Sequence, residues 1–171
     1  VPYLFADPSL VEFWRQRLKP FEGLKVGVAW QGNPKYPSDR DRSIPLDKFA
    51  YLAQLPGICL VSLQKHVGLE QLGQSRSLIP IIEFSDFDEA SGPFMDTAAI
   101  MKNLDLVITS DTAIPHLAGA LRVPVWLALP YVPDWRWVLD RTDSPCYPTI
   151  PLFPQKSPGD WPGVFSEIRT A

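Results

Sequence analysis

Short apolar runs alternate along this chain with longer segments whose apolar residues recur at helical spacing. The runs are typical of buried strands, and they lie at 25–30, 58–63, 78–84, 105–109 and 124–129. Helices are predicted between them, at 45–55, 95–103 and 113–121. Strands that alternate with helices favour right-handed crossovers and parallel pairing. The sequence therefore predicts an α/β fold, a doubly wound, mainly parallel sheet of five or six strands with helices on both faces.

Two flanking segments complete one predicted domain over residues 1–171. Residues 1–23 form an N-terminal helical flank, in which four apolar residues follow Pro8-Ser9 at roughly helical spacing: Leu10, Phe13, Trp14 and Leu18. Residues 24–130 carry the core βαβ units, and residues 131–171 form a loop-rich segment that ends in a helix at 164–169. A chain of this length can bury a core of its own.

The charge balance and the apolar runs narrow the class of partner. The chain has 16 Lys and Arg against 19 Asp and Glu, a formal net charge of −3, and its sequence shows no basic run, so nucleic acid is not an expected partner. The most apolar run, 123–132, is interrupted by prolines and falls well short of the roughly 20 residues that a spanning helix needs. We therefore expect no membrane span.

The two cysteines indicate the compartment. Cys59 and Cys146 fit neither a disulfide framework nor a metal site, because metal ligands are closely spaced in such motifs. A reducing cytoplasm is the expected location, and no metal is expected. The chain begins at Val1 rather than at a methionine, so we expect it to be a piece of a longer protein.

The turn that follows the predicted strand 105–109 carries the strongest candidate site. Asp111, Thr112 and His116 stand where a strand meets a helix N-terminus, which favours phosphates and other anions. His116 lies about 200° around the helix from Ile114, a residue of the apolar face, so it should point toward a ligand on the same side as Thr112. The alternative is a plain N-cap with a surface histidine, and capping and ligand binding can coexist.

A second candidate site lies in the loop after the first predicted strand. Gln31, Gly32 and Asn33 directly follow that strand, and Arg42 and Ser43 precede the next helix. Glycine permits close approach of a ligand, and a guanidinium suits phosphate oxygens. Taken alone, such a segment is more often a solvated loop.

Two further pairs of residues belong to the candidate set. Gln64 and Lys65 end the second strand and should flank the same edge of the sheet, although a polar strand exit is ordinary. Asp96 and Thr97 are first of all helix-starting residues.

Several enzyme classes lack their signatures. The sequence contains no G-x-G-x-x-G after the first strand, no G-x-x-x-x-G-K-[ST] loop and no G-x-S-x-G elbow, which argues against dinucleotide oxidoreductases, P-loop NTPases and α/β-hydrolases. A phospho-receiver needs paired acids after its first strand, where this chain has WQGN. The DWRW segment at 134–137 is expected to be a structural plug or edge cover.

Several segments, taken in order, resemble a known family. They are VGVAWQGNPKYPSDRDRSIPL, LVSLQK, FMDTAAIMKNLDLVITSDTAIPHLAGALRVPVWLALP, PDWRW and SPCYPTIPLFPQ. They resemble the C-terminal part of bacterial tetratricopeptide-repeat proteins that end in a glycosyltransferase-like domain, which is similar to the ADP-heptose lipopolysaccharide heptosyltransferases. The resemblance implies one half of a GT-B fold, a pair of Rossmann-like domains, with the C-terminal half gripping a nucleotide sugar.

The resemblance also suggests roles for particular residues. Asp111, Thr112 and His116 match the D-T-G-x-x-H motif of the heptosyltransferases, which lies near the donor diphosphate and sugar. Arg42 lies near the position where that family places a basic phosphate contact. Ala113 stands where the family has glycine. The resemblance implies no cofactor beyond the nucleotide-diphosphate sugar that serves as substrate. The acceptor site and the catalytic base would come from an N-terminal half.

The leading hypothesis is the donor-binding domain of a metal-independent GT-B glycosyltransferase, incomplete as an enzyme on its own. Its partners would be the donor and either the N-terminal half or a tetratricopeptide-repeat region. The alternative is a non-catalytic scaffold domain with a degenerate glycosyltransferase fold, which Ala113 and the acidic balance favour. A third hypothesis is a complete small nucleotide-binding domain that acts alone.

Overall fold

The computed structural model describes residues 2–137 and 147–171, and it contains one parallel sheet. The sheet has six strands: β1 (Leu24–Ala29), β2 (Ile58–Ser62), β3 (Ile81–Ile82), β4 (Leu106–Thr109), β5 (Val125–Leu129) and β6 (Leu152–Pro154). Their order is β3-β2-β1-β4-β5-β6, and each neighbouring pair is parallel. This is a Rossmann-like α/β fold, so the predicted fold class is confirmed.

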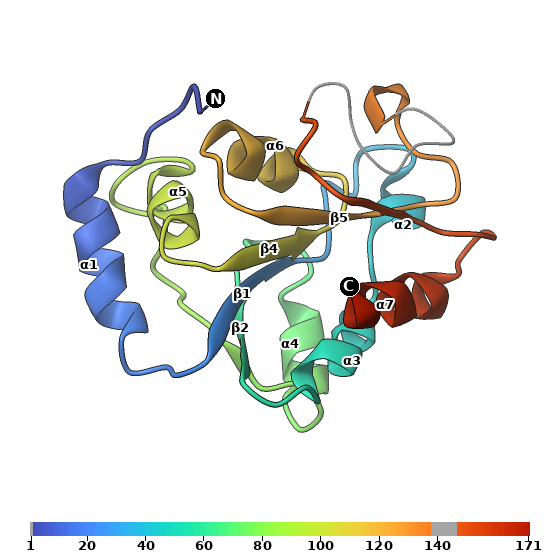
Figure 1. The fold of residues 1–171 in the computed structure, drawn as a ribbon, viewed down its shortest axis with the longest axis horizontal. Helices are drawn as coiled ribbons and strands as arrows, with labels where there is room; N and C mark the ends of the chain where they lie inside the picture. The colour runs from blue at the N-terminus through green and yellow to red at the C-terminus, as the bar shows by residue number, and fades with distance from the viewer. Residues whose placement is uncertain (1, 138–146) are drawn as a thin grey trace.

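Helices cover both faces of the sheet (Figure 1). The α-helices are α1 (Pro8–Leu18), α2 (Asp39–Arg42), α3 (Ala50–Ala53), α4 (Glu70–Ser75), α5 (Met95–Met101), α6 (Ala113–Ala120) and α7 (Trp161–Thr170). Two 3₁₀ turns, η1 (Leu46–Phe49) and η2 (Trp135–Trp137), complete the elements. Apolar residues of α1, α5 and α6 pack into one core cluster, and those of η1, α3, α4 and α7 pack into the other.

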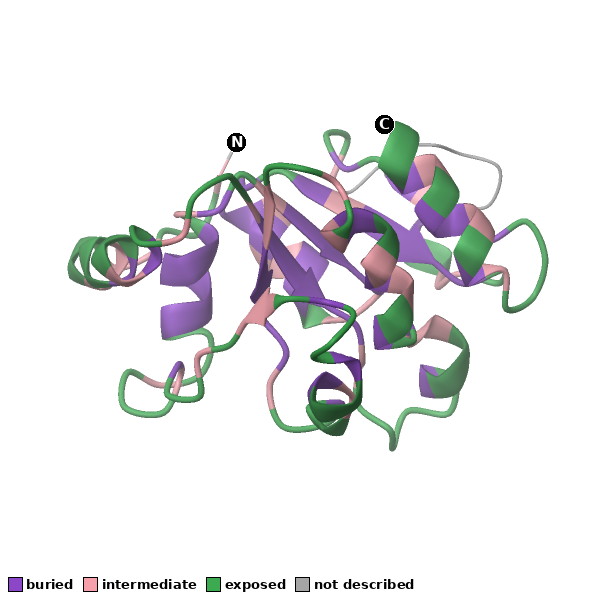
Figure 2. Ribbon diagram, turned by 90° about the horizontal axis from the view of Figure 1, so that it is seen from below, coloured by how far each residue is buried: buried purple, intermediate pink, exposed green. Residues whose placement is uncertain are grey.

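The sheet is buried between these two layers of helices (Figure 2). Val28 of β1, Val107 of β4 and Leu127 of β5 are all fully buried. Burial on both faces explains why the strands read as nearly continuous apolar runs rather than as alternating ones.

Two predicted elements differ from the structure. The strand expected at 78–84 shortens to Ile81–Ile82, because the backbone N–H groups of Leu78 and Ile79 both donate to the carbonyl oxygen of Ser75 and continue the turn after α4. The helix expected at 45–55 divides into the 3₁₀ turn η1 and the short helix α3.

The C-terminal segment adds a strand that the sequence did not locate. β6 (Leu152–Pro154) pairs with β5 inside the segment predicted to be loop-rich. Of that segment, residues 138–146, with Cys146 and its proline-rich loop, lie outside the described residues. The helix α7 that follows is longer than the predicted 164–169.

The order of the strands fixes where a ligand can reach the sheet. β1 lies between β2 and β4, with Val28 beside Ser62 on one side and Ile108 on the other. The chain moves outward from β1 through β2 to β3 and then returns to β4, so the direction of winding reverses between β1 and β4. In open α/β sheets, ligands bind at the carboxyl ends of the strands at this switch point.

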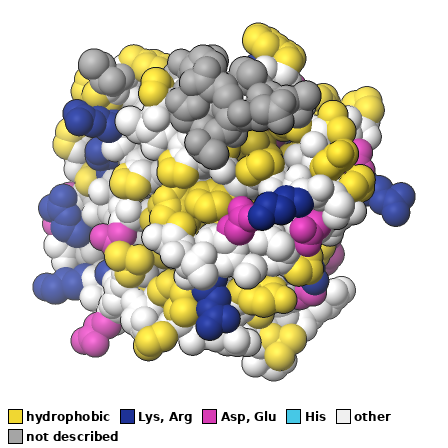
Figure 3. Space-filling view, turned by 45° about the vertical axis from the view of Figure 1, so that its right-hand side comes forward, with side chains coloured by type: hydrophobic (Ala, Val, Ile, Leu, Met, Phe, Trp, Pro, Cys, Tyr) yellow, Lys and Arg dark blue, Asp and Glu magenta, His cyan; other side chains and the backbone are white. Residues whose placement is uncertain are grey.

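The surface and the helices show two further features. On the face seen in Figure 3, acidic and basic side chains lie interspersed with hydrophobic ones rather than in a field of one sign. Within residues 2–137 and 147–171, none of the helices combines the length and the hydropathy that crossing a bilayer requires.

Candidate functional site

A cleft of about 540 Å³ opens at the switch point, and we call it the switch-point cleft. Its walls come from the segments that follow β1, β2, β3 and β4. Most of the predicted site residues line it, namely Gln31, Gly32, Asn33, Arg42, Gln64, Lys65, Thr97 and Thr112. The structure therefore brings together candidates from four separate parts of the chain.

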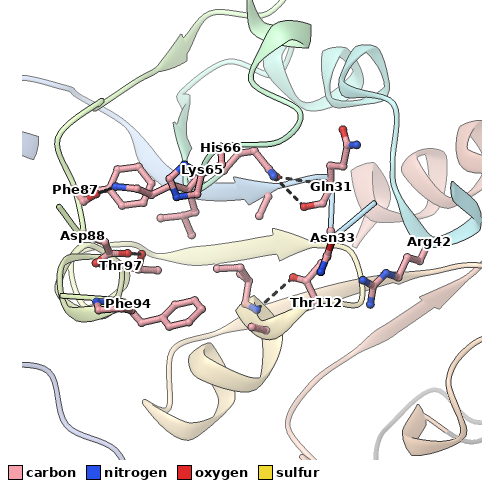
Figure 4. A pocket seen from close by; sticks show the side chains of 17 residues that line it. Gln31, Asn33, Arg42, Lys65, His66, Phe87, Asp88, Phe94, Thr97 and Thr112 are labelled. Carbon is pink, nitrogen blue, oxygen red and sulfur yellow. Dashed lines mark hydrogen bonds between the residues drawn. The ribbon is translucent and has the colours of Figure 1, made fainter. Parts of the chain in front are cut away.

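The two ends of the switch-point cleft differ in chemistry. Phe87 and Phe94 lie at one end, and Asn33, Thr112 and Arg42 lie at the other (Figure 4). Aromatic side chains suit a flat ring, whereas hydroxyl, amide and guanidinium groups suit an anion. The cleft can therefore hold a ligand with an aromatic part and a negatively charged part.

Gln64 holds the first loop in place. Its Oε1 accepts from the backbone N–H groups of Trp30 (2.9 Å) and Gln31 (3.0 Å). Its Nε2 donates to the carbonyl oxygens of Gln31 (2.9 Å) and Val67 (2.8 Å). The side chain is 6% exposed, so its amide is largely committed to the backbone. Gln64 thus shapes the cleft more than it offers groups to a ligand.

Arg42 is the cation at the polar end. Its Nε pairs with Asp39 Oδ1 at 3.0 Å, and its Nη1 donates to the carbonyl oxygen of Asp111 at 2.8 Å. Its guanidinium also lies 4.4 Å from the ring centre of Tyr36. Gly32 leaves room for this arrangement, because a Cβ there would overlap the Asp39 carboxylate and the guanidinium. The planar fork is therefore fixed beside the cleft before any ligand arrives.

Lys65 is the second cation of the cleft. Its Nζ donates to the carbonyl oxygen of Phe87, lies 4.7 Å from the centre of the Phe87 ring and is 3.9 Å from Glu89 Oε1. Ser43, a predicted member of the site, supports the loop after β1 and does not line the cleft. Its Oγ donates to Asp39 Oδ2 and lies 3.4 Å from Gly32 N, which donates to it.

Asp96 and Thr97 form a network at the start of α5. Asp96 is 5% exposed and accepts from Trp14 Nε1 at 2.7 Å and from Asp88 N at 2.8 Å. Asp88 in turn accepts from the backbone N–H groups of Asp96 and Thr97 and from Thr97 Oγ1. These bonds satisfy the first turn of α5 and tie it to α1, as expected for helix-starting residues.

Thr112 begins α6 and lines the cleft. Its Oγ1 accepts from Ile114 N at 3.3 Å, so it is the N-cap of the helix. Neither Asp111 nor His116 is among the residues that line the switch-point cleft. The predicted trio therefore separates, with only its central member facing this cavity.

The His116 ring packs instead against η2. It stacks on Trp137 with ring centres 5.2 Å apart and lies 5.6 Å from the ring of Tyr147. Burial lowers the pKa of His116, while the nearby Asp111 carboxylate acts in the opposite direction. Trp137 is fully buried and Trp135 is 77% exposed, so only one indole of the DWRW segment can act as the predicted plug.

Asp111 faces a second cavity. Burial raises its pKa, although the Trp137 indole and the Arg42 guanidinium both favour the charged form. This second cavity measures about 620 Å³ and lies beside the carboxyl ends of β5 and β6, with Arg42 on its wall as well. Arg42 therefore stands between the two cavities.

The wall of the switch-point cleft includes residues that sequence reasoning missed. His66, Asp88 and Phe94 all line it, and each has a positive φ, between 59° and 64°. Backbone angles in the left-handed region raise the free energy of residues other than glycine, so contacts with the surrounding structure must stabilise these three turns. The Gly92-Pro93 pair before Phe94 was the turn signal that the sequence offered.

Among the described residues, no group of three or more His, Cys, Asp or Glu is placed to hold a metal ion.

Comparisons with known proteins concern the fold. No protein-family model matches the chain. The protein FlbA of Caulobacter vibrioides is 27% identical over 172 residues, which is 99% of this chain and 28% of FlbA. The solved structure of E. coli ADP-heptose LPS heptosyltransferase II superimposes with a TM-score of 0.64 at 15% identity, over 98% of this chain and 52% of that one.

The chain has a glycosyltransferase-like fold. It spans about half the length of the heptosyltransferase and just over a quarter of FlbA.

Proposed function

We propose that this chain binds a nucleoside diphosphate sugar in the switch-point cleft, as the donor-binding domain of a glycosyltransferase. The observation that carries the proposal is the cleft itself, which lies at the switch point of a glycosyltransferase-like fold and has an aromatic end beside Lys65 and a polar end that holds Arg42. Because the likeness covers 52% of the heptosyltransferase chain, the proposal concerns binding and not turnover.

The two ends of the cleft suggest an orientation for the donor. We place the base against Phe87 and Phe94, where an apolar ring would be shielded from water. The diphosphate would then lie between Arg42 and the N-terminus of α6 at Thr112, since guanidinium groups and helix N-termini both stabilise phosphate charge. We propose ADP as the first nucleotide to test, because the structural neighbour is an ADP-heptose transferase.

The setting of the domain is part of the same proposal. The chain aligns with 28% of FlbA, which supports placing it in a longer bacterial protein. We propose an N-terminal glycosyltransferase half or a tetratricopeptide-repeat region as its neighbour, and the cytoplasm as its location.

Calorimetric titration with ADP, UDP and GDP, and with one sugar conjugate of each, tests the proposal. We expect saturable 1:1 binding of one nucleotide. Binding should weaken roughly tenfold in Arg42→Lys, which loses the planar fork at the phosphate end, and in Lys65→Met, which removes the ammonium beside Phe87 at the base end. Lys48→Met is the matched control, because Lys48 pairs with Asp47 on η1 and does not line the cleft. Binding that is equally strong in all three variants would contradict the proposed site.

Two observations favour a second candidate function, a non-catalytic scaffold domain. Both cations of the cleft already have partners within the chain, Arg42 in Asp39 and Lys65 in Glu89 and the Phe87 carbonyl. Ala113 also places a methyl group at the start of α6. A folded sample that binds none of the six ligands would favour the scaffold function.

A further inference from the structure

His66 places a ring on the wall of the switch-point cleft that no other part of the described chain engages. The residue is exposed and lines the cleft. Within residues 2–137 and 147–171, its imidazole forms no hydrogen bond or ion pair. The three charged side chains of the cleft, those of Arg42, Lys65 and Asp88, are by contrast all bonded within the chain. The imidazole nitrogens are therefore available to a ligand.

The turn that carries His66 is held at both ends. On one side, Lys65 Nζ donates to the carbonyl oxygen of Phe87 at the aromatic end of the cleft. On the other side, Trp30 Nε1 donates to the carbonyl oxygen of Gly68 at 3.1 Å, which joins the turn to the end of β1. His66 therefore lies between the aromatic end of the cleft and the loop after β1, as Figure 4 shows.

The backbone conformation of His66 also indicates a ligand-binding role. Among the described residues, four other than glycine have positive φ, and three of them, His66, Asp88 and Phe94, line this cleft. Asp88 and Phe94 belong to the start of α5, where one bonds the first turn and the other is the N-cap. His66, with φ at 63°, caps no helix, because the N-cap of α4 is Leu69. Strained residues of this kind cluster at ligand-binding sites.

The position of His66 determines which part of a nucleotide it would meet. In the proposed orientation, the base lies against Phe87 and Phe94, and the diphosphate lies between Arg42 and Thr112. The ribose joins the base to the diphosphate, so it would lie level with His66. A neutral imidazole has one donor and one acceptor nitrogen, and ribose hydroxyls both donate and accept. The two groups are therefore complementary.

We propose that His66 binds the ribose hydroxyls of a nucleoside diphosphate in the switch-point cleft and thereby selects ribonucleotides over deoxyribonucleotides. The inference rests on the proposed function, because it takes the orientation of the donor from there. A site that hydrogen-bonds a hydroxyl disfavours the analogue that lacks it, since a polar group is then left unpaired. His66 is thus a specificity-determining residue of the cleft.

Calorimetric titration with ADP, UDP and GDP, and then with the 2′-deoxy and 3′-deoxy forms of the nucleotide that binds, tests this inference. We expect the wild-type chain to bind at least one deoxy form roughly tenfold more weakly than the ribonucleotide. His66→Gly should bind the ribonucleotide as weakly as that deoxy form, with no further loss for the deoxy form itself. Glycine adopts positive φ without strain, so the turn should keep its conformation.

Arg122→Gly is the matched control for His66→Gly. Arg122 is the fourth residue with positive φ, and it lines neither the switch-point cleft nor the second cavity. The same substitution there should leave the preference for the ribonucleotide unchanged.

The ring signals of the two histidines in NMR spectra give a second readout. His66→Gly assigns them, since it removes one of the two sets. We expect the ribonucleotide to shift the His66 signals saturably. A nucleotide that saturates the chain without moving these signals would overturn the inference.

Two further results would overturn the role of His66 and leave the proposed donor site in place. One is equal affinity of the wild-type chain for the ribonucleotide and both deoxy forms, and the other is a His66→Gly chain that keeps the wild-type preference. Binding of no nucleotide by the folded wild-type chain would instead overturn the proposed function, and the role of His66 with it. The two kinds of failure are therefore distinguishable.

Discussion

Arg42 Nη1 donates to the main-chain carbonyl oxygen of Asp111 at 2.8 Å, and this bond joins the loop after β1 to the turn after β4. The two residues are 69 positions apart in the chain. Because Arg42 also pairs with Asp39, whose side chain is 5% exposed, one guanidinium both neutralises a buried carboxylate and connects the two segments. The wall between the two cavities therefore depends on a single side chain.

Loss of the Arg42 charge should destabilise the chain strongly. Arg42→Gln leaves the Asp39 carboxylate buried without its cation, so we expect the free energy of unfolding to fall by about 3–5 kcal/mol. Adding Asp39→Asn should recover more than half of the loss, because the uncompensated charge is then gone. Urea denaturation of the two single variants and the double variant measures both effects. A loss below about 1 kcal/mol in Arg42→Gln would show that water reaches Asp39 freely.

His116 should make the stability of the chain depend on pH. Its pKa is lowered by burial from an ordinary value of 6.5, so the folded state holds fewer protons than the unfolded state just below that pH. Stability should therefore fall as the pH drops through about 6.5 and level off below the folded pKa. His116→Gln should remove this slope, and denaturation midpoints measured from about pH 8 to pH 5 check it.

The Asp111 carboxylate should raise the pKa of His116. This carboxylate favours the charged form of His116, so Asp111→Asn should lower the His116 pKa further. The ring signals in an NMR titration report this pKa, and His116→Gln assigns them. An unchanged or raised His116 pKa in Asp111→Asn would mean that the two groups do not interact.

Gln64 should contribute more to stability than a polar residue at a strand exit usually does. Gln64→Met keeps the length of the side chain but removes four hydrogen bonds to backbone groups of the loops after β1 and β2. We expect the free energy of unfolding to fall by roughly 3 kcal/mol. Gln54→Met, at an exposed position on the end of α3, is the control and should change it by less than about 0.5 kcal/mol. Equal effects of the two substitutions would contradict the role assigned to Gln64.

The fold was predictable because burial and periodicity are local signals. The runs that became β1, β2, β4 and β5 are apolar on both faces, and α6 begins at the capping residue Thr112. β6 was not located, because a three-residue strand ending in proline has no periodicity of its own and forms only by pairing with β5.

The candidate site was predictable in part, for a different reason. Parallel strands place their exits at one edge, so residues such as Gln31 and Thr112 could be grouped from the sequence. The direction of the His116 side chain was not predictable, because it is set by Trp137, which the chain brings to the helix only after β5.

The wall of the switch-point cleft contains residues in the left-handed region, and these residues shape the cleft at a cost to the stability of the chain. His66 and Phe94 hold backbone angles that glycine would adopt without strain, at a cost on the order of 1 kcal/mol each. A glycine at either position would thus relieve the folded backbone and at the same time remove a side chain that bounds the cleft. The relieved turns would favour the folded state while the cleft lost part of its wall, so a search for more stable variants would be expected to erode this cleft first.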